Sequence, residues 1–281
     1  MIRIAHSPDA DDAFMFYALT EGLIDTRGLE FENILEDIES LNKRALEGVY
    51  ELTAISFHVF AYVQNRYTLL TAGASIGDGY GPIVVSKKPL RSLKSIKIAI
   101  PGRFTSAYLA LKLYEQDFEE VFAPFDKILE LVINQVVDAG VLIHEAQLSY
   151  EDMGLFKVVD LGEWWKSKTG LVLPLGANAA RRDLGLELIK TLDELLRESI
   201  NYALSHRDLA LNFSRAYARE IKFNKEKLDR FVGMYVNRWS LECSSELRAS
   251  VREFLNMGAS LGIVPSVNGP IFFDEELDAA G

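Results

Sequence analysis

Four short stretches of the chain place chemically capable side chains at or just after the ends of apolar, strand-like runs. They are HSPDADD (6–12), TAISFH (53–58), PGRFTSA (101–107) and LIHEAQ (142–147). Together they supply carboxylates that accept hydrogen bonds, hydroxyls that donate them, and histidines that exchange protons near neutral pH. Ligands of open α/β sheets bind beyond the carboxyl ends of the strands, where such loops converge. The four stretches therefore predict a single ligand site.

His144 follows the apolar run VLI and is the candidate catalytic residue. A neutral imidazole at a strand end that faces a cleft is suited to act as a general base. Glu145 is its neighbour, and because adjacent strand residues point to opposite faces, we do not expect Glu145 to orient the imidazole. The alternative is a hydrogen-bonded structural histidine, and the residues alone leave both possibilities open.

Thr105 and Ser106 stand at the start of a predicted helix, SAYLALKLYEQD, and are candidate ligands of an anion. A helix N-terminus presents unpaired backbone N–H groups and a partial positive charge, which together stabilise a carboxylate or a phosphate. Ser56, at the end of the strand ELTAIS, is a third candidate hydroxyl donor. The alternative for Thr105 or Ser106 is a simple N-cap, which would serve the helix rather than a ligand.

The stretch HSPDADDAF (6–14) holds three carboxylates and a histidine within nine residues. This composition suits a metal site, an acid/base pair or a capped helix start. A histidine metal site with His6 and His58 is not expected, because the sequence has no short pair of the form H-x-x-x-H. Asp12 is the candidate substrate-binding carboxylate of the stretch, and whether it faces a cleft or caps its helix stays open at this point.

Alternating strand and helix patterns must position these side chains. Strands are expected at 2–6, 29–35 and 51–56, and helices at 11–22, 38–48 and 57–64. This order predicts a mostly parallel sheet with covering helices. The glycine-rich stretch GASIGDGYGPIVVSKKPL (73–90) is expected to carry the chain to a second unit.

The second unit repeats the order of the first. Overlaying 4–19 on 98–113 without a gap aligns four identical residues and places Asp12 opposite Ser106, and a further overlay places Ser56 opposite His144. The stretch 169–184 then returns the chain to the first unit, after which the pattern is helical. We therefore expect an α/β fold with a hinged cleft between lobe 1, residues 1–86 and 181–281, and lobe 2, residues 87–180.

Composition narrows the possible partners. The 281 residues carry a net charge of −11, which disfavours nucleic acid and anionic membranes as partners. The single cysteine, Cys243, excludes an internal disulfide, and no leader or apolar run of membrane-spanning length is apparent, so a cytoplasmic location is expected. No cofactor is expected, because neither a dinucleotide-binding nor a P-loop motif occurs. The sequence does not fix the oligomeric state.

The sequence resembles the 1,4-dihydroxy-6-naphthoate synthases of the futalosine route to menaquinone. The likeness is carried, in family order, by SPDADDAFMFYAL, ELTAISFHVFAYV, GASIGDGYGPIVVS, PGRFTSA, GVLIHEAQLSY and LPLGANA. Some members have S-P-C-P-N-D-T-F in the first loop. Asp12 agrees with that pattern, whereas Asp9 and Asp11 depart from it and are expected in the loop and first turn, where they suit the positive end of the helix.

The resemblance implies a fold like that of the type II periplasmic binding proteins. It also implies a carbon–carbon lyase that converts cyclic dehypoxanthinyl futalosine to 1,4-dihydroxy-6-naphthoate and dihydroxyacetone without a cofactor. His144 matches the family's catalytic histidine, Thr105, Ser106 and Ser56 would hold the substrate carboxylate, and Asp12 would accept hydrogen bonds from the sugar hydroxyls. Two alternatives remain, a cytoplasmic solute-binding or sensor protein for a small carboxylate and the chorismate dehydratase of the same pathway.

Overall fold

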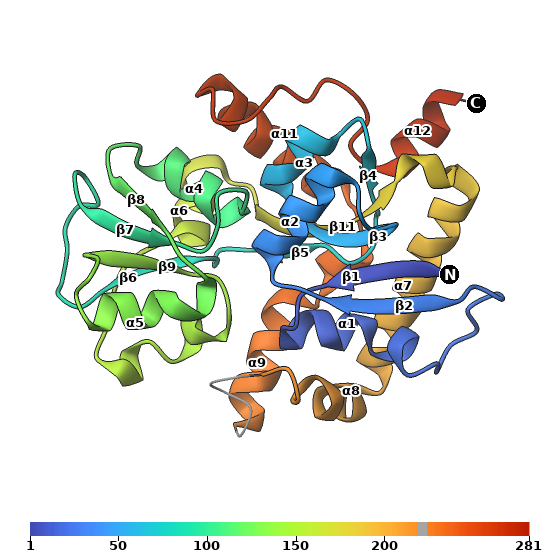
Figure 1. The fold of residues 1–281 in the computed structure, drawn as a ribbon, viewed down its shortest axis with the longest axis horizontal. Helices are drawn as coiled ribbons and strands as arrows, with labels where there is room; N and C mark the ends of the chain where they lie inside the picture. Colours follow the sequence, from blue (N-terminus) through green and yellow to red (C-terminus); the bar gives the residue numbers. More distant parts are fainter. Residues whose placement is uncertain (219–223, 281) are drawn as a thin grey trace.

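Two α/β lobes lie side by side in the computed structural model, which describes residues 1–218 and 224–280 (Figure 1). The strands of lobe 1 are β1 (Ile2–His6), β2 (Phe31–Leu35), β3 (Leu52–Ser56), β4 (Tyr67–Leu69), β5 (Ser75–Gly77) and β11 (Leu173–Arg181). Those of lobe 2 are β6 (Ile83–Ser86), β7 (Lys97–Ile100), β8 (Glu119–Phe122), β9 (Ala139–Leu142) and β10 (Phe156–Asp160).

Both sheets are mixed. The first has the order β2-β1-β3-β11-β4, with β5 paired to β11, and the second has the order β10-β6-β9-β7-β8. In each, a central strand (β1 or β7) is parallel to both neighbours, and the strand beyond (β11 or β6) runs antiparallel. The expectation of mostly parallel sheets is therefore corrected to mixed sheets, because the first strand after each crossing, β6 or β11, runs against the other strands of its sheet.

The two sheets share one local topology, as the internal repeat predicts. The set β2-β1-β3-β11 in lobe 1 has the same pairing directions as the set β8-β7-β9-β6 in lobe 2. In this correspondence the loop between β1 and the helix after it, α1 (Ala10–Thr20), matches the loop between β7 and the helix after it, α4 (Ser106–Tyr114). The ends of β3 and β9, where Ser56 and His144 lie, match in the same way.

The crossings between the sheets lie slightly before the expected lobe limits. β6 pairs within the second sheet although 1–86 was assigned to lobe 1, and β11, from Leu173, pairs within the first sheet although lobe 2 was expected to reach residue 180. Strand pairing decides where a segment belongs, and the apolar patterns of these two segments carry no information about their partners.

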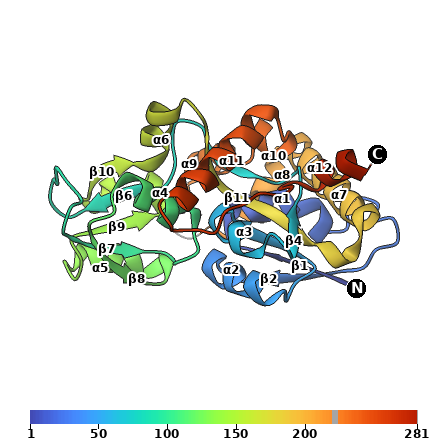
Figure 2. The same cartoon turned by 90° about the horizontal axis from the view of Figure 1, so that it is seen from above.

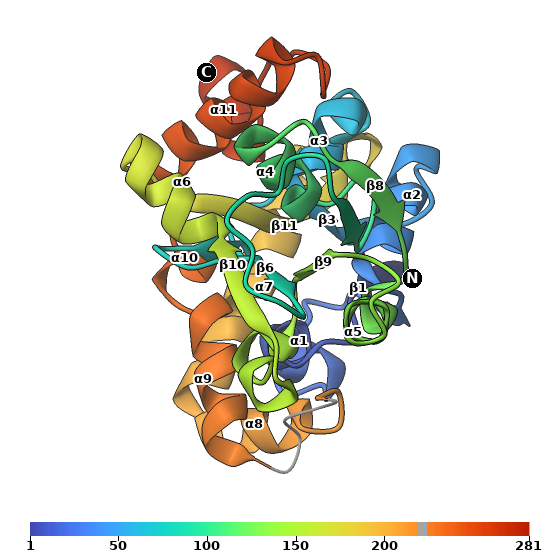
Figure 3. The same ribbon diagram turned by 90° about the vertical axis from the view of Figure 1, so that its left-hand side faces the viewer.

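Helices cover both faces of each sheet (Figures 2 and 3). In lobe 1 they are α1 (Ala10–Thr20), α2 (Ile38–Glu47), α3 (Phe57–Val63), α7 (Leu186–Ser205), α8 (Arg207–Ser214), α9 (Lys225–Tyr235), α10 (Arg238–Leu241), α11 (Ser245–Ser260) and α12 (Phe273–Ala280). In lobe 2 they are α4 (Ser106–Tyr114), α5 (Ile128–Ile133) and α6 (Leu161–Thr169). Among the described helices, none combines the length and hydrophobicity of a membrane span.

An apolar core runs from one lobe into the other beside the hinge. It includes Trp165 of α6, which is fully buried, meets Phe254 of α11 edge-on at 5.4 Å and donates a 2.8 Å hydrogen bond to the Val172 carbonyl. Gly258 of α11 approaches Leu109 of α4 so closely that an added Cβ would lie 3.0 Å from it. This packing fixes the distance between the lobes at the hinge and so sets the geometry of the space between them.

Candidate active site

A cavity with about 750 Å³ of space, part of it open to solvent, lies between the lobes. Lobe 1 lines it with the loop before α1, the end of β3, the middle of β11 (175–178) and Tyr235 of α9, and lobe 2 with the start of α4 and Ile143. Four of the sequence-predicted site residues line this cavity, namely Asp12, Ser56, Thr105 and Ser106. His144 is not among the lining residues, although its neighbour Ile143 is.

Ser56 and Ser106 stand at the N-termini of α3 and α4, one from each lobe. The Ser56 Oγ accepts a hydrogen bond from the Asn42 Nδ2 at 3.0 Å, and the Ser106 Oγ accepts one from the His58 backbone N–H at 3.3 Å. Because each oxygen accepts from a fixed N–H donor, each hydroxyl hydrogen is left to donate into the cavity. The two hydroxyls therefore offer this part of the cavity hydrogen-bond donors of the kind that an anion requires.

Thr105 serves α4 as its N-cap. Its Oγ1 accepts a hydrogen bond from the Tyr108 backbone N–H at 3.2 Å and donates one to the Gly102 carbonyl at 2.9 Å. The hydroxyl hydrogen is thus directed to the backbone, so the capping alternative describes this side chain. Its contribution to anion binding is to fix the first turn of α4, whose N–H groups face the same end of the cavity.

Replacing Thr105 with alanine is expected to lower the free energy of unfolding by about 1 kcal/mol, the usual cost of removing a helix cap. Chemical denaturation of the two proteins measures this difference. Thr105→Ser retains the capping oxygen and should restore most of the loss. Equal stability of wild type and the alanine variant would contradict the capping role.

Asp12 faces the cavity and also holds the loop that leads into α1. Its Oδ2 accepts a hydrogen bond from the Ser7 backbone N–H at 3.1 Å, and the Ser7 Oγ donates to the Asp9 Oδ2 at 2.8 Å. Asp9 precedes α1 and Asp11 lies in its first turn, as expected from the sequence. Of the two possibilities left open for Asp12, the structure shows the first, because Asp12 lines the cavity and its carboxylate binds the loop before α1 rather than capping the helix.

Burial shapes the ionisation of the acidic end of the cavity. It raises the pKa of the Asp12 carboxyl to about 6, and the hydrogen bonds from Ser7 oppose this rise. Burial, together with the negative charges of Asp12 and Asp9, also raises the pKa of Asp11 well above its ordinary value. These carboxylates resist further negative charge beside them, so an anionic ligand group is favoured beside the donors of Ser56 and Ser106 instead.

His144 lies two residues beyond β9 and is buried. Its Nδ1 accepts a hydrogen bond from the Ala146 backbone N–H at 3.3 Å, which makes it the N-cap of a short 3₁₀ helix (Glu145–Leu148). Its ring meets Phe125 edge-on, with the centroids 5.0 Å apart. With Nδ1 accepting from a backbone N–H, the hydrogen of a neutral ring is carried by Nε2.

Side chains of α2 and α3 in lobe 1 form hydrogen bonds to the backbone of the PGRFT loop of lobe 2. The Glu39 carboxylate accepts hydrogen bonds from the backbone N–H groups of Arg103 at 3.1 Å and Phe104 at 3.0 Å. The His58 Nδ1 lies 3.0 Å from the Thr105 carbonyl, so this nitrogen carries the hydrogen. His58 is therefore a link between the lobes and does not line the cavity, and His6 is likewise buried, stacked on Phe16 at 4.5 Å.

Acidification is expected to weaken the fold through His58. Burial lowers its pKa from 6.5 to about 4, so between these values the unfolded chain binds the proton more strongly. The contribution of His58 is fully present above pH 6.5 and is lost as the pH falls toward 4, by about 2 to 3 kcal/mol at pH 4.5. Denaturation of wild type and His58→Asn at pH 7.5 and 4.5 measures it.

The asparagine variant keeps a side-chain N–H donor for the Thr105 carbonyl but cannot be protonated in this range. The carboxylates titrate in both proteins, and the difference between the two pH dependences therefore isolates His58. A wild type and a variant that lose equal stability on acidification would contradict the assignment.

Two buried amides of the site were not anticipated from the sequence. Asn42 of α2 accepts from the Ser56 backbone N–H at 2.9 Å through Oδ1, and its Nδ2 donates to Ser56 and, at 3.2 Å, to the Phe104 carbonyl. Asn178 of β11 lines the cavity directly. The available signal was an amide within an otherwise apolar helix face or strand, where burial demands a polar partner.

The sequence is similar to those of known proteins over nearly its whole length. A family model described as menaquinone biosynthesis matches residues 2–260. The 1,4-dihydroxy-6-naphthoate synthase of Thermus thermophilus is 42% identical over 271 residues, which cover 96% of this chain and 98% of that protein. The chain belongs to the 1,4-dihydroxy-6-naphthoate synthases, lyases of menaquinone biosynthesis. The synthase of Streptomyces coelicolor is 32% identical over 275 residues, 96% of each chain.

Similar solved structures show the fold class of this chain. A protein of Archaeoglobus fulgidus is 46% identical, with a TM-score of 0.90 over 94% of this chain and 98% of that chain. The alkanesulfonate-binding protein of Xanthomonas axonopodis has a TM-score of 0.72 at 12% identity over 94% of each chain. Similarity at that level of identity shows the fold alone, and it makes this synthase a two-lobed protein of the type II periplasmic-binding-protein kind, as the resemblance implied.

Proposed function

We propose that this lyase converts cyclic dehypoxanthinyl futalosine to 1,4-dihydroxy-6-naphthoate and releases the sugar-derived fragment as dihydroxyacetone. One observation carries the proposal. Ser56 and Ser106, at two helix N-termini of different lobes, face the same cavity as Asp12 on the acidic side. A substrate with a carboxylate at one end and sugar hydroxyls at the other matches this distribution of donors and acceptors.

The carboxylate would lie between the hydroxyls of Ser56 and Ser106 and the first N–H groups of α3 and α4. Thr105 keeps that turn of α4 in place through its cap. The hydroxyls of the sugar-derived part would donate to Asp12, whose ionised form accepts them at neutral pH because its pKa is about 6. The substrate is thereby oriented across the cleft before any bond changes.

His144 would act as the general base. Forming the aromatic ring requires loss of a proton from carbon and cleavage of the carbon–carbon bond to the sugar remnant, and a single positioned base can begin this sequence. Since Nδ1 of the neutral ring holds the lone pair, it would take the proton after leaving the Ala146 N–H. Ile143, the neighbour of His144, already lines the cavity. A closing movement of the lobes on bound substrate would bring the His144 ring to the cavity as well.

Incubation with cyclic dehypoxanthinyl futalosine tests the proposal, with both products followed by mass spectrometry. Formation of 1,4-dihydroxy-6-naphthoate and dihydroxyacetone in equal amounts is the expected result. Binding of the substrate without turnover would favour a solute-binding or sensor protein. Conversion of chorismate with loss of water in a parallel incubation would favour the dehydratase of the same pathway.

A further inference from the structure

Asn178 of β11 lines the cavity and carries a buried, unsatisfied acceptor. The side chain is 1% exposed and lines the cavity, and its Nδ2 donates a 3.0 Å hydrogen bond to the Gly73 carbonyl. Its Oδ1 is buried and has no hydrogen-bond partner among residues 1–218 and 224–280. The orientation of the amide follows from Gly73, because a carbonyl requires the NH₂ end. A buried amide oxygen without a partner costs free energy, which a ligand donor would recover.

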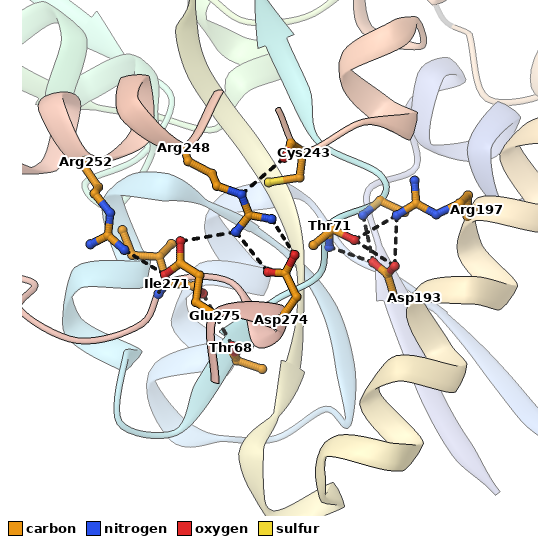
Figure 4. Close-up of polar contacts among 11 residues, drawn as sticks. Thr68, Thr71, Asp193, Arg197, Cys243, Arg248, Arg252, Ile271, Asp274 and Glu275 are labelled. Atoms are coloured by element: carbon orange, nitrogen blue, oxygen red, sulfur yellow. Dashed lines mark hydrogen bonds and ion pairs between the residues drawn. The ribbon is translucent and has the colours of Figure 1, made fainter. Parts of the chain in front are cut away.

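The segment that leads to Gly73 is held by a frame of polar contacts among Thr71, Asp193 and Arg197 (Figure 4). The buried Asp193 carboxylate accepts hydrogen bonds from the backbone N–H groups of Thr71 at 2.7 Å and Ala72 at 2.8 Å and from the Thr71 Oγ1 at 2.8 Å. Arg197 donates to the same carboxylate at 3.0 Å and to the Thr71 Oγ1 at 2.8 Å. These contacts fix the segment that leads to Gly73, and hence the carbonyl that orients the amide.

Gly73 completes the frame by allowing a close approach. Its φ is +76°, in the left-handed region, and a Cβ added there would lie 2.5 Å from the Asn178 Nδ2 and 2.7 Å from the Leu196 Cδ2. The Gly73 backbone N–H donates to the Ser240 carbonyl at 2.7 Å. Hydrogen bonds thus hold the segment on both sides of Gly73. The fold fixes the position of Asn178 even though its Oδ1 accepts no hydrogen bond from the described residues.

We propose that Asn178 is a specificity-determining substrate-binding residue whose Oδ1 accepts a hydrogen bond from a hydroxyl of the sugar-derived part of the substrate. This inference rests on the proposed function and deepens it. A neutral amide oxygen adds acceptor capacity to the cavity that Asp12 also lines, without adding negative charge to the carboxylates already there. Asp193 is a positioning residue, which acts on Asn178 through Thr71 and Gly73.

Binding measurements on Asn178→Ala test the proposal with two ligands, the cyclic substrate and the product 1,4-dihydroxy-6-naphthoate. The product keeps the carboxylate and the ring but lacks the sugar-derived part. Removing one acceptor of a neutral hydrogen bond is expected to weaken the substrate by about tenfold and to leave the affinity for the product unchanged. Titration calorimetry gives both affinities, and KM for the substrate should rise in parallel.

Asp193→Asn is the matched control for a merely structural effect. It loosens the frame but keeps the Asn178 oxygen, so it should lower the melting temperature and weaken both ligands to a similar extent. An Asn178→Ala variant that weakens both ligands equally would overturn the proposal, since the residue would then support the cavity in general. Unchanged affinity for both would overturn it as well, because an ordered water would then satisfy Oδ1.

Wild-type turnover in the same preparation separates this inference from the proposed function. Without turnover of the cyclic substrate by wild type, the proposed function fails, and the role of Asn178 fails with it. With wild-type turnover intact, an Asn178→Ala variant of unaltered KM contradicts the role of Asn178 alone.

Discussion

Replacing His144 with asparagine is expected to lower kcat by about 10²- to 10⁴-fold, the usual contribution of a positioned general base. Asparagine cannot take a proton from carbon, yet its side-chain oxygen can accept the Ala146 N–H bond that the His144 Nδ1 now accepts. The 3₁₀ helix should therefore keep its cap, and the fold should survive. Steady-state kinetics with the cyclic substrate, together with a thermal melt, measure both properties.

His144→Ala separates the base from the cap. Alanine removes both functions, so it should show the same loss of kcat and an additional loss of stability. The affinity of either variant for the product 1,4-dihydroxy-6-naphthoate should stay near that of wild type, since His144 does not line the cavity. An asparagine variant with nearly normal kcat would contradict the assignment of His144 as the base.

The fold alone does not make this protein a lyase. Binding proteins with TM-scores near 0.7 share its lobes and its cleft, and a two-lobed cleft in itself only captures a ligand. Catalysis requires a group that changes protonation state as the ligand reacts. In this chain the candidate is His144, held ready on a short 3₁₀ helix behind Ile143. If His144 is the base, as we propose, the difference between a binder and this lyase rests on the loop of lobe 2 that carries it.

Much of the fold follows from the sequence because the apolar patterns are local. In the structure, the strands at 2–6 and 52–56 and the helices after them lie where the spacing of their apolar residues predicts them. Strand direction is not local. β11 reads as an ordinary apolar strand, and only its return across the hinge makes it antiparallel to β3. The edge strand β8 (Glu119–Phe122) is not predictable from its residues, because EEVF carries charge and little apolar pattern.

The site divides in the same way between local and long-range determinants. Asp12, Ser56 and Ser106 were predicted from their positions after strands, and such positions are readable from sequence because strand ends meet at one edge of a sheet. Asn42 reaches Phe104 across 62 residues and Asn178 reaches Gly73 across 105, contacts that only the assembled fold creates. The role of Thr105 depended on the direction of one hydroxyl hydrogen, which no sequence pattern encodes.

Removing both serine hydroxyls is expected to weaken substrate binding more than any other change to the anion-binding end of the cavity. Each hydroxyl would donate a charge-assisted hydrogen bond to the carboxylate, so Ser56→Ala and Ser106→Ala should each raise KM about 10- to 100-fold. If both hydroxyls donate to one carboxylate, the hydroxyl that remains in each single variant can reorient toward it. The effect of the double variant on KM should then differ from the product of the two single effects. Kinetics on all four proteins form the double-mutant cycle.

Stability controls keep this cycle interpretable. In Ser56→Ala one N–H of the Asn42 Nδ2 still donates to the Phe104 carbonyl, but the other loses its acceptor. The free energy of unfolding should therefore fall by about 1 to 3 kcal/mol, a loss that denaturation measures separately from KM. Ser214→Ala provides a matched buried serine that does not line the cavity and whose hydroxyl donates to the Leu211 carbonyl of α8, and its KM should equal that of wild type. If Ser56→Ala and Ser106→Ala bind the substrate as tightly as Ser214→Ala does, the carboxylate is held elsewhere. In that case the helix N-termini of α3 and α4 would not orient the substrate, and the alignment of its sugar-derived part with Asp12 would fail too.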